Sequence, residues 1–385
     1  MKKILHIITR LEKGGSSKNV IYSMNLYGFD SYLIYGPSNL QEEISNLNKE
    51  KIFEIKNLQR EISIFKDIKA LYEIFLIIRK IKPDIVHSHT SKAGILGRMA
   101  ALIYNLTQAD KVVVVHTPHG HLFYGYYGKL KTTLFKYLEF LFSFITDYFI
   151  ALTEAEKKEN ISASIGNENK WIVIHSGIDF PGHIINKIES RKKIKIDNDV
   201  FAIGCVARLE RVKGIEILIR AAYEMEKTRK INKVKYFIIG DGKDKERLKK
   251  LVIDLNLSDK IIFLGQVDNI FEILPSFDIY VQPSLNEAMG RAVIEAQYCS
   301  LPVIASDACG LPYSMIENET GFLFERGNYK ELSDKIYALF SDDIKRNLFS
   351  LNARKFVETK ENGYLKFSTE NMNFKLSSFY KKIFN

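Results

Sequence analysis

A chain of 385 residues exceeds the length at which one hydrophobic core keeps growing, so its length predicts two domains. Its 46% hydrophobic and 26% charged residues are typical of soluble globular proteins. The net charge of +10 is spread evenly over both halves, which excludes a basic tail and suits phosphate-bearing ligands or an anionic membrane, although a lysine-rich composition explains it equally well.

Short apolar, β-branched runs alternate with helical patterns along the whole chain. In the first half, the predicted strands are residues 3–8, 31–36, 84–89, 111–116, 147–152 and 171–176. In the second half, they are residues 200–207, 235–240, 260–265, 277–282 and 302–306. Helical patterns lie between these strands, so the sequence predicts an α/β protein with two doubly wound, Rossmann-like domains whose parallel sheets are covered on both faces.

The boundary between the two halves is a polar, charge-rich segment at 175–199. We therefore predict an N-terminal domain at 1–185, a C-terminal domain at 195–358 and a final helix at 359–385. The final helix has an aromatic face of Phe374, Phe379 and Tyr380, and we expect it to cross back onto the first domain. Capping-box patterns at 153–156 and 328–331 predict two helix starts.

Compartment and membrane topology are constrained by the cysteines and by the apolar runs. Cys205, Cys299 and Cys309 are too few and too irregularly spaced for a disulfide or metal framework, which indicates a reducing cytoplasm. The first apolar run ends at Arg10 and is interpreted as a strand. The richest apolar stretch, 138–152, contains acidic residues and is shorter than the about 20 residues that span a bilayer. We expect a cytoplasmic protein, free or at the inner face of the membrane.

Ligands of open α/β sheets bind beyond the carboxyl ends of the strands. The segment "VARLERVKG" follows a predicted strand there, and its Arg208 and Lys213 stand five residues apart just before Gly214, which is expected to open a helix. Two cations at a helix start suit a diphosphate. Gly242 and Gly265 end the next strands, where glycine permits close backbone approach.

Two glutamates flank the start of a predicted helix in "PSLNEAMGRAVIEA". The preceding strand is expected to stop at Pro283 and the helix to begin near Gly290, next to Arg291. Glu287 then lies in the connecting loop, and Glu295 lies one to two turns inside the helix. The two carboxylates are therefore expected to have different partners.

In their fixed order, these motifs resemble the retaining GT-B glycosyltransferases of family 4, which carry a glycosyl transferases group 1 domain. The resemblance rests on "GCVARLERVKG", "IIGDG", "FLG", "PSLNEAMGRAVIEA" and "LPVIASDACG". It extends to "EKGGSSKN", "VHSHTSKAGILGR", "TPHGHLFYG" and "HSGID" in the first half and to "FSTENM" in the tail. It covers nearly the whole chain and implies two domains facing across a cleft.

The resemblance implies roles for the residues of the second half. Arg208 and Lys213 match the pair that stabilises the leaving diphosphate, Glu295 matches the glutamate that binds the ribose, and Glu287 matches the one that faces the transferred sugar. The remaining residues expected to bind the donor in this half are Gly242, Gly265, Gln266, Val267, Ala288, Met289, Gly290 and Arg291.

In the first half, Gly14 and Gly15 match the glycine loop that closes over the phosphates, and His119 matches the active-site histidine that contacts the donor sugar. His121 has the right residue type but a less certain place. Metal binding is the competing interpretation of the histidines, and it lacks an acidic or cysteine partner pattern. The family works without a central metal, so we expect no metal and no cofactor.

One departure from the family pattern is Tyr313, which follows Pro312 where many relatives have glutamate, so the contact of that glutamate is in doubt. Cys309-Gly310 also replaces the usual pair of glycines. Gly310 is retained, and its backbone is still expected near the donor.

The acceptor side is expected in the basic, aromatic segment 123–144, which includes Lys129, Lys131 and Lys136. This segment could rest on an anionic membrane. In the alternative interpretation, its aliphatic residues Leu134, Leu138, Leu141 and Ile145 simply pack in the core.

The sequence thus predicts transfer, with retention of anomeric configuration, of a hexose or N-acetylhexosamine from a nucleotide diphosphate sugar, most simply a UDP-sugar. The acceptor is expected to be a lipid-linked molecule or a saccharide, in the biosynthesis of surface polysaccharide such as capsule or lipopolysaccharide. No nucleic acid is expected as a partner. The alternatives are a UDP-sugar 2-epimerase of the same fold and a catalytically silent protein that binds sugar nucleotides. The Arg-x4-Lys and Glu-x7-Glu combination argues against both.

Overall fold

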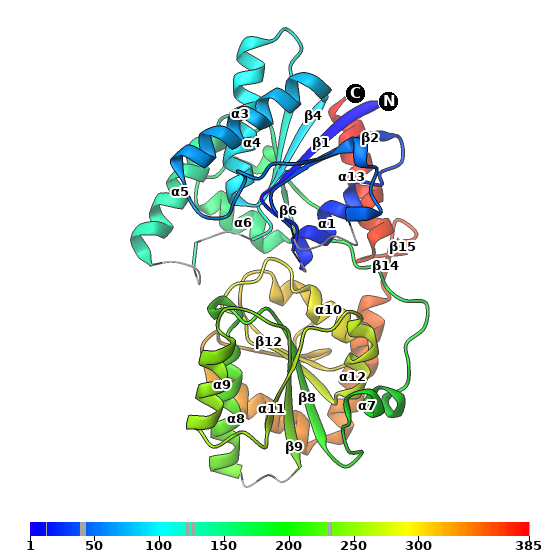
Figure 1. The fold of residues 1–385 in the computed structure, drawn as a ribbon. Helices are drawn as coiled ribbons and strands as arrows, with labels where there is room; N and C mark the ends of the chain where they lie inside the picture. The colour runs from blue at the N-terminus through cyan, green and yellow to red at the C-terminus, as the bar shows by residue number, and fades with distance from the viewer. Residues whose placement is uncertain are drawn as a thin grey trace. The chain divides into compact units, whose positions relative to one another are not determined.

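The computed structural model describes residues 1–385 except 13, 39–43, 121–122, 125–127, 230, 232 and 385. The chain divides into two compact units (Figure 1). Unit 1 comprises Met1–Phe123, Gly128–Gly177 and Thr369–Asn385, and unit 2 comprises Tyr124–Tyr127 and Ile178–Ser368.

Unit 1 is built on a parallel sheet of seven strands in the order β3-β2-β1-β4-β5-β6-β7. The strands are β1 Lys2–Ile8, β2 Phe29–Tyr35, β3 Ile52–Glu54, β4 Ile85–His89, β5 Val113–Thr117, β6 Tyr148–Ala151 and β7 Trp171–Val173. All six strands expected in this half are present. The sequence missed β3, which is three residues long and lies at the sheet edge, because so short a run has no readable period.

The helices of unit 1 cover both faces of its sheet. They are α1 Gly15–Ser23, α3 Ile64–Ile81, α4 Ser91–Thr107, α5 Lys129–Ser143, α6 Glu154–Ser162 and α13 Thr369–Ile383, with short 3-10 turns at Lys49–Lys51 and Glu168–Lys170. One core contains residues of α3 and α4, such as Ile74 and Leu96, and another contains residues of α13, such as Leu376.

The final helix crosses back onto unit 1, as the sequence predicted. Phe379 and Tyr380 of α13 are buried against Ile4, Ile85 and other residues of the sheet. The predicted aromatic face was wrong for Phe374, which is 46% exposed, because the buried face of α13 runs instead through Met372 and Leu376.

Helix α5 contradicts the interpretation that its aliphatic residues pack in the core. Leu134 is 55% exposed and Leu141 is 41% exposed, while Leu138 and Ile145 are half-buried. The periodic pattern correctly indicated a helix with an apolar stripe, but much of that stripe faces outward. Within the described part of the chain, no helix is both long and apolar enough to cross a membrane.

Unit 2 has a parallel sheet of six strands in the order β10-β9-β8-β11-β12-β13. The strands are β8 Phe201–Val206, β9 Val234–Ile239, β10 Ile261–Gly265, β11 Ile279–Gln282, β12 Val303–Ser306 and β13 Gly321–Phe324. The five expected strands are present, and the short edge strand β13 was missed. A separate antiparallel pair consists of β14 Lys360–Glu361 and β15 Tyr364–Leu365.

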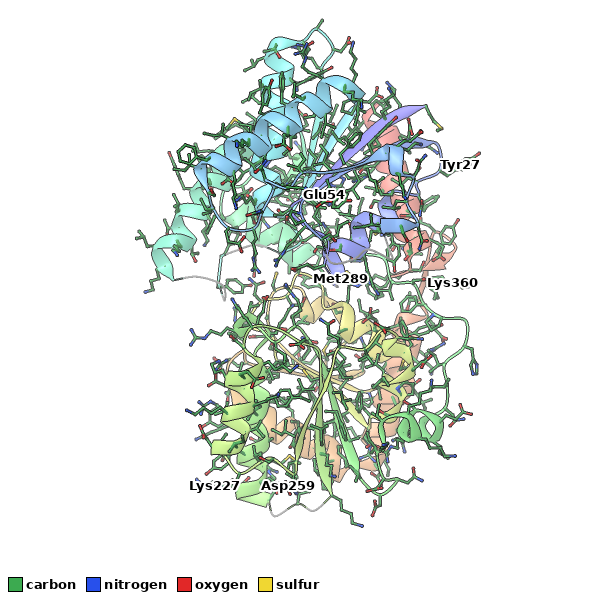
Figure 2. All side chains as sticks on the ribbon, viewed as in Figure 1. Tyr27, Glu54, Lys227, Asp259, Met289 and Lys360 are labelled. Atoms are coloured by element: carbon green, nitrogen blue, oxygen red, sulfur yellow. The ribbon has the colours of Figure 1, made fainter. Side chains whose placement is uncertain are left out.

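Helices flank this sheet in the described part of unit 2, and side chains fill the space between the layers (Figure 2). They are α7 Lys187–Ile194, α8 Ile215–Arg229, α9 Lys245–Asp254, α10 Arg291–Tyr298, α11 Tyr329–Ser341 and α12 Asp343–Val357. Short 3-10 turns are Arg211–Lys213, Ile270–Glu272, Leu274–Ser276 and Leu311–Ser314.

Helix boundaries agree with the caps that the sequence predicted. The side chains of Thr153 and Asn328 accept hydrogen bonds from the backbone N–H groups of Glu156 and Glu331, at the starts of α6 and α11. Helix α7 lies inside the segment that was interpreted as a polar link. Its buried Arg191 donates to the carbonyl of Ser276 and to Asp278, which fastens α7 to unit 2.

Candidate active site

The predicted donor-binding loops of unit 2 lie at one edge of its sheet. They follow β8, β9, β10 and β11, which are neighbours in the order β10-β9-β8-β11 and run parallel. Because the carboxyl ends of parallel strands meet at the same edge, the sheet brings these four loops together. Met289, labelled in Figure 2, belongs to the loop after β11.

Lys213 and Glu287 form the central ion pair of this edge. Nζ of Lys213 donates to Oε2 of Glu287 over 2.6 Å, and the hydroxyl of Ser284 donates to the same oxygen over 3.2 Å. Both charged side chains are mostly buried, which strengthens their attraction relative to a surface pair. The structure thus places a cation at the start of α8 beside a carboxylate from the loop after β11.

The loop containing Lys213 is braced against the loop containing Glu287. The backbone N–H of Leu285 donates to the carbonyl of Val212 over 2.7 Å. Gly214 has φ = 66°, and a Cβ there would collide with the carbonyl oxygen of Pro283. Glycine at 214 therefore permits both the turn into α8 and the contact between the two loops.

Glycine is favoured at positions 242 and 265 for different reasons. A Cβ on Gly242 would collide with the carbonyl of Leu209, so this glycine gives the close backbone approach that the sequence predicted. Gly265 has φ = 74°, a backbone conformation that favours glycine, and no atom of the described residues lies within 4 Å of its Cβ position, so the close approach expected there stays a prediction. Gln266 is exposed, and Val267 packs partly against the sheet.

The start of α10 has the predicted arrangement. The strand β11 stops before Pro283, Gly290 has φ = 75° as the N-cap, and Arg291 is the first helical residue. Glu287 is in the loop, and Glu295 is inside the helix with Oε1 3.6 Å from the guanidinium of Arg291. Both side chains of that pair are half-buried.

The loop 287–290 is held from behind by the loop after β12. The N–H of Gly310 donates to the carbonyl of Glu287 over 2.8 Å, and a Cβ on Gly310 would collide with the carbonyl of Ala288. Ala288 and Met289 are buried. Tyr313, which departs from the family pattern, is 41% exposed in the following 3-10 turn.

Arg208 lies in the loop after β8, two residues beyond the strand. Its guanidinium is 3.4 Å from Oε1 of Glu210, and its side chain is 42% exposed. Exposed pairs at this distance are weak, so an anionic ligand can compete for the guanidinium.

Unit 1, described by itself, has loops at the carboxyl edge of its own sheet that include other predicted site residues. Gly14 and Gly15 follow β1 and begin α1. His119 lies two residues after β5 with a left-handed φ of 56°, and the N–H of Gly120 donates to the buried carboxylate of Glu156 over 2.6 Å. A strained backbone held by neighbours is common at functional sites. His121 lies outside the described residues.

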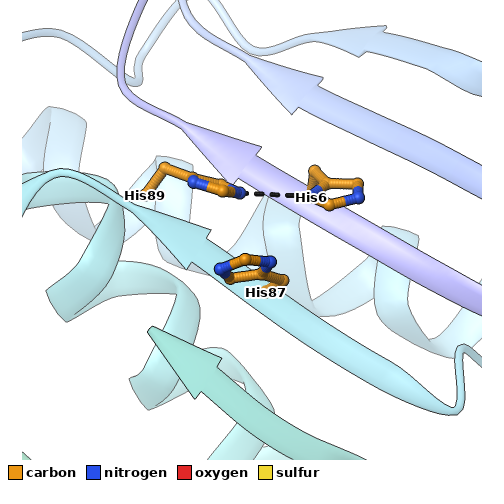
Figure 3. Close-up of side chains that lie close together, drawn as sticks. All are labelled: His6, His87 and His89. Carbon is orange, nitrogen blue, oxygen red and sulfur yellow. Dashed lines mark hydrogen bonds between the residues drawn. The ribbon is translucent and has the colours of Figure 1, made fainter. Parts of the chain in front are cut away.

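Three further histidines extend from His119 into the sheet. His6 on β1 and His87 on β4 are register partners, and His89 follows two residues later on the same face (Figure 3). Nδ1 of His6 is 3.1 Å from Nε2 of His89, and Nδ1 of His89 is 2.9 Å from Nε2 of His119. Sequence reasoning missed His6, because only strand pairing brings it to His89.

Burial keeps these rings neutral. It lowers the pKa of His6 to about 3 and that of His119 to about 3, and it lowers the pKa of His87 and His89 well below the usual value. Nδ1 of His87 is 2.6 Å from the hydroxyl of Tyr380, and its Nε2 is 2.7 Å from the hydroxyl of Thr117. Helix α13 is thereby tied to the histidine cluster.

The nitrogens of His6, His87 and His89 lie within 4.8 Å of one another, a spacing that could hold a metal ion. Both nitrogens of His87 are already hydrogen-bonded to hydroxyl groups, and the cluster includes no carboxylate or thiolate. Every ring nitrogen of these three histidines except Nε2 of His6 has a hydrogen-bonding neighbour, so the arrangement fits a polar network better than a zinc site.

Comparisons with known proteins agree with this arrangement. The family model described as glycosyl transferases group 1 matches residues 186–356, and the model described as glycosyltransferase family 4 matches residues 37–180. The capsular polysaccharide biosynthesis glycosyltransferase CapM of Staphylococcus aureus is 28% identical over 372 residues, which are 93% of each chain. An Escherichia coli enzyme, UDP-Gal:alpha-D-GlcNAc-diphosphoundecaprenol alpha-1,3-galactosyltransferase, is 33% identical over 309 residues, which are 79% of this chain and 78% of that one.

The fold is shared with solved structures. Anabaena HepE in complex with UDP and glucose has a TM-score of 0.82 at 20% identity and covers 99% of this chain and 100% of its own. Sucrose-phosphate synthase of Thermosynechococcus elongatus has a TM-score of 0.83 at 19% identity and covers 100% of this chain and 99% of its own. The two parallel sheets, the Lys213–Glu287 edge and these matches together show that the chain is a GT-B glycosyltransferase belonging to family 4.

Proposed function

We propose that this glycosyltransferase moves a hexose or N-acetylhexosamine from a UDP-sugar to a lipid-linked or saccharide acceptor in surface polysaccharide biosynthesis, with retention of anomeric configuration. The observation that carries the proposal is the ion pair of Lys213 and Glu287, which places a cation and a carboxylate next to each other at the carboxyl edge of the sheet, before the start of α8. An ammonium group beside a helix N-terminus favours a diphosphate.

The proposed reaction exchanges one bond for another at the anomeric carbon. The bond from that carbon to the diphosphate oxygen breaks, and its electron pair leaves with UDP. The acceptor hydroxyl oxygen forms the new bond on the same face, and its proton passes to the departing phosphate oxygen. Arg208 and Lys213 stabilise the negative charge that develops on the diphosphate, and Glu295 binds the ribose hydroxyls. We propose that these cations make a divalent metal unnecessary.

The printed names of the relatives suggest which substrates to test first. The Escherichia coli relative is named for UDP-galactose and a diphosphoundecaprenol-linked N-acetylglucosamine. The Staphylococcus aureus relative is named for capsular polysaccharide. We therefore rank UDP-galactose, UDP-glucose and UDP-N-acetylhexosamines above GDP- and ADP-sugars as donors for this chain.

The test measures nucleoside diphosphate release from UDP-, GDP- and ADP-sugars, with and without bacterial lipid extract and with and without EDTA. We expect release from one UDP-sugar that rises with the extract and is unchanged by EDTA. Conversion of the sugar to its epimer would instead identify a 2-epimerase. Binding of a UDP-sugar with no turnover in any mixture would identify a silent binder.

We further propose that α5 rests on an anionic membrane where the lipid-linked acceptor is located. Its outward face carries Leu130, Leu134, Tyr137 and Leu141, which repeat at three to four residues and are all exposed. Lysine side chains at 129 and 131 flank this apolar stripe. An amphipathic helix of this kind gains free energy from apolar burial and from attraction to anionic lipid.

Vesicle sedimentation tests the membrane contact. We expect the protein to sediment with vesicles of phosphatidylglycerol and phosphatidylcholine and less with phosphatidylcholine alone. Leu134→Glu should reduce sedimentation several-fold, whereas Ile253→Glu, at an equally exposed isoleucine of α9 in unit 2, should not. If both variants sediment with the vesicles to the same extent as the wild-type protein, a contact through α5 is contradicted.

A further inference from the structure

Three imidazole rings of unit 1 form a continuous chain of hydrogen bonds. The rings are His119 after β5, His89 at the end of β4 and His6 in β1, joined by nitrogen pairs 2.9 Å and 3.1 Å apart. At each end one nitrogen, Nδ1 of His119 and Nε2 of His6, is buried and has no partner among the described residues. We call this set the histidine chain.

A chain of neutral rings has two possible proton arrangements, because each ring carries one N–H. In the first, the rings donate from His119 toward His6, which leaves an N–H at Nε2 of His6. In the second, they donate from His6 toward His119, which leaves an N–H at Nδ1 of His119. The two arrangements therefore differ in which end of the chain holds a donor that lacks an acceptor.

The surroundings of the two ends differ. His6 is 0% exposed in the middle of β1, so an N–H at its Nε2 could not reach an acceptor, and a buried donor without an acceptor is costly. His119 lies in the loop at the carboxyl edge of the sheet and is partly exposed as a residue, but its Nδ1 atom is itself buried, so a ligand supplies the acceptor only when the atoms that cover Nδ1 move aside. The second arrangement puts the unpaired N–H at this end.

His116 shows that this fold accommodates a bare Nε2 in its interior. Its Nδ1 lies 3.1 Å from the carbonyl oxygen of Ser88, which can only accept, and 2.9 Å from the hydroxyl of Ser88, which can accept or donate, so an N–H on Nδ1 fits both contacts. Its Nε2 then has no proton, and it is buried without a partner in the part of the chain that the structure describes. His6 in the second arrangement has the same state.

We propose that His6 and His89 are positioning residues that fix His119 as its Nδ1–H tautomer, so that His119 donates a hydrogen bond to an oxygen of the sugar nucleotide. In this state Nε2 of His119 accepts from His89 and Nδ1 already holds a proton, so the ring does not act as a general base. The tautomer of His119 depends only on residues of unit 1. The identity of the accepting oxygen, a sugar hydroxyl or a phosphate oxygen, rests on the proposed function.

Nitrogen NMR of the full-length protein labelled with 15N-histidine tests the tautomer directly. We expect His6, His89 and His119 to be protonated at Nδ1, as the internal reference His175 must be, because its Nδ1 lies 2.7 Å from the carbonyl of Leu152. The His119→Ala variant lacks the ring-nitrogen signals of His119, so the signals that disappear from its spectrum are assigned to that residue. Protonation of His119 at Nε2 would overturn the proposal, whether or not the protein transfers sugar.

Two variants of His89 separate positioning from simple packing. His89→Asn keeps an amide N–H near the position of Nδ1, whereas His89→Leu removes the donor to His119. We expect His89→Leu to lower kcat/KM for the UDP-sugar by about 10-fold, the size of one hydrogen bond, and to shift His119 toward Nε2–H. His89→Asn should retain most of the wild-type kcat/KM and most of the Nδ1–H tautomer of His119. Equal activity of the two variants, with His119 unchanged in its spectrum, would rule out a positioning role.

Binding of UDP alone identifies the accepting oxygen. If His89→Leu weakens UDP and the UDP-sugar equally, the acceptor is a phosphate oxygen, and if it weakens only the UDP-sugar, the acceptor is a sugar hydroxyl. Unchanged binding of both ligands and unchanged turnover would show that the N–H of His119 does not contact the sugar nucleotide.

Discussion

Nζ of Lys213 lies 2.6 Å from Oε2 of Glu287, although 74 residues separate them in the chain. The pair joins the loop after β8 to the loop after β11, and Gly214 lets the two backbones touch. Glu287 is thus the counter-ion of Lys213 in this structure. A bound diphosphate would compete for the same ammonium group and free Glu287 to face a sugar.

Lys213→Ala is expected to lower kcat by about 100- to 1,000-fold, the usual cost of removing one charge-stabilising donor from an active site. Thermal unfolding followed by circular dichroism should shift by only a few degrees, because the hydroxyl of Ser284 still binds Glu287. The matched control is Lys249→Ala, which breaks an exposed pair with Glu246 on α9. Turnover of Lys213→Ala at the wild-type rate would refute the phosphate assignment.

The two glutamates are expected to differ in kinetics, since we propose that Glu295 binds the ribose and that Glu287 faces the transferred sugar. Glu295→Ala should raise KM for the UDP-sugar by about 10-fold with a smaller change in kcat, because ribose contacts persist through the reaction. Glu287→Ala should mainly lower kcat. Steady-state kinetics of both variants against the same donor measure this split, and the reverse pattern would exchange the two roles.

The sequence was sufficient to place Glu287 in a loop and Glu295 in a helix, because Pro283 and Gly290 mark the element boundaries locally. It could not place His6 against His89. That contact depends on β1 pairing in register with β4, more than 80 residues away, and one sequence contains no signal for the pairing.

Helix α5 shows a second limit of sequence reasoning. The spacing of Leu134 and Leu141 correctly indicates an apolar stripe, but periodicity does not say what covers the stripe. In the structure both residues are exposed, so the core interpretation failed although the helix was expected. The short edge strands β3 and β13 were missed for another reason, since three or four residues fit many patterns.

Gly214→Ala is expected to destabilise unit 2 by about 3 kcal/mol or more, because the new methyl group meets the carbonyl of Pro283 in addition to the cost of φ = 66°. Gly265→Ala has a similar φ of 74° but open space around the Cβ position, so about 1 kcal/mol is expected. Urea unfolding followed by circular dichroism compares the two variants. A cost for Gly265→Ala equal to that for Gly214→Ala would show that the loop contact is unimportant.

Unit 1 is expected to lose stability as the pH falls below about 6.5. Burial lowers the pKa of His6 to about 3, so between pH 3 and 6.5 the unfolded chain binds a proton that the folded chain does not. The free energy of unfolding therefore decreases by up to about 1.4 kcal/mol per pH unit for each such histidine. This pH dependence fades above pH 6.5 and is nearly absent by about pH 7.5, where the unfolded histidines are almost all neutral.

Trp171 reports on this unfolding selectively, because it is the single tryptophan of the chain and is buried in β7 of unit 1. Urea unfolding followed by its fluorescence at pH 7.5, 6.5 and 5.5 should show a small decrease of stability in the upper interval and a decrease about three times larger in the lower one. His6→Leu should reduce the slope between pH 6.5 and 5.5, since one titrating ring is gone. Replacing the exposed His183 by alanine should leave the slope unchanged. A slope that is the same in all three proteins would mean that His6 is protonated in the folded chain, and the histidine chain would then carry a charge.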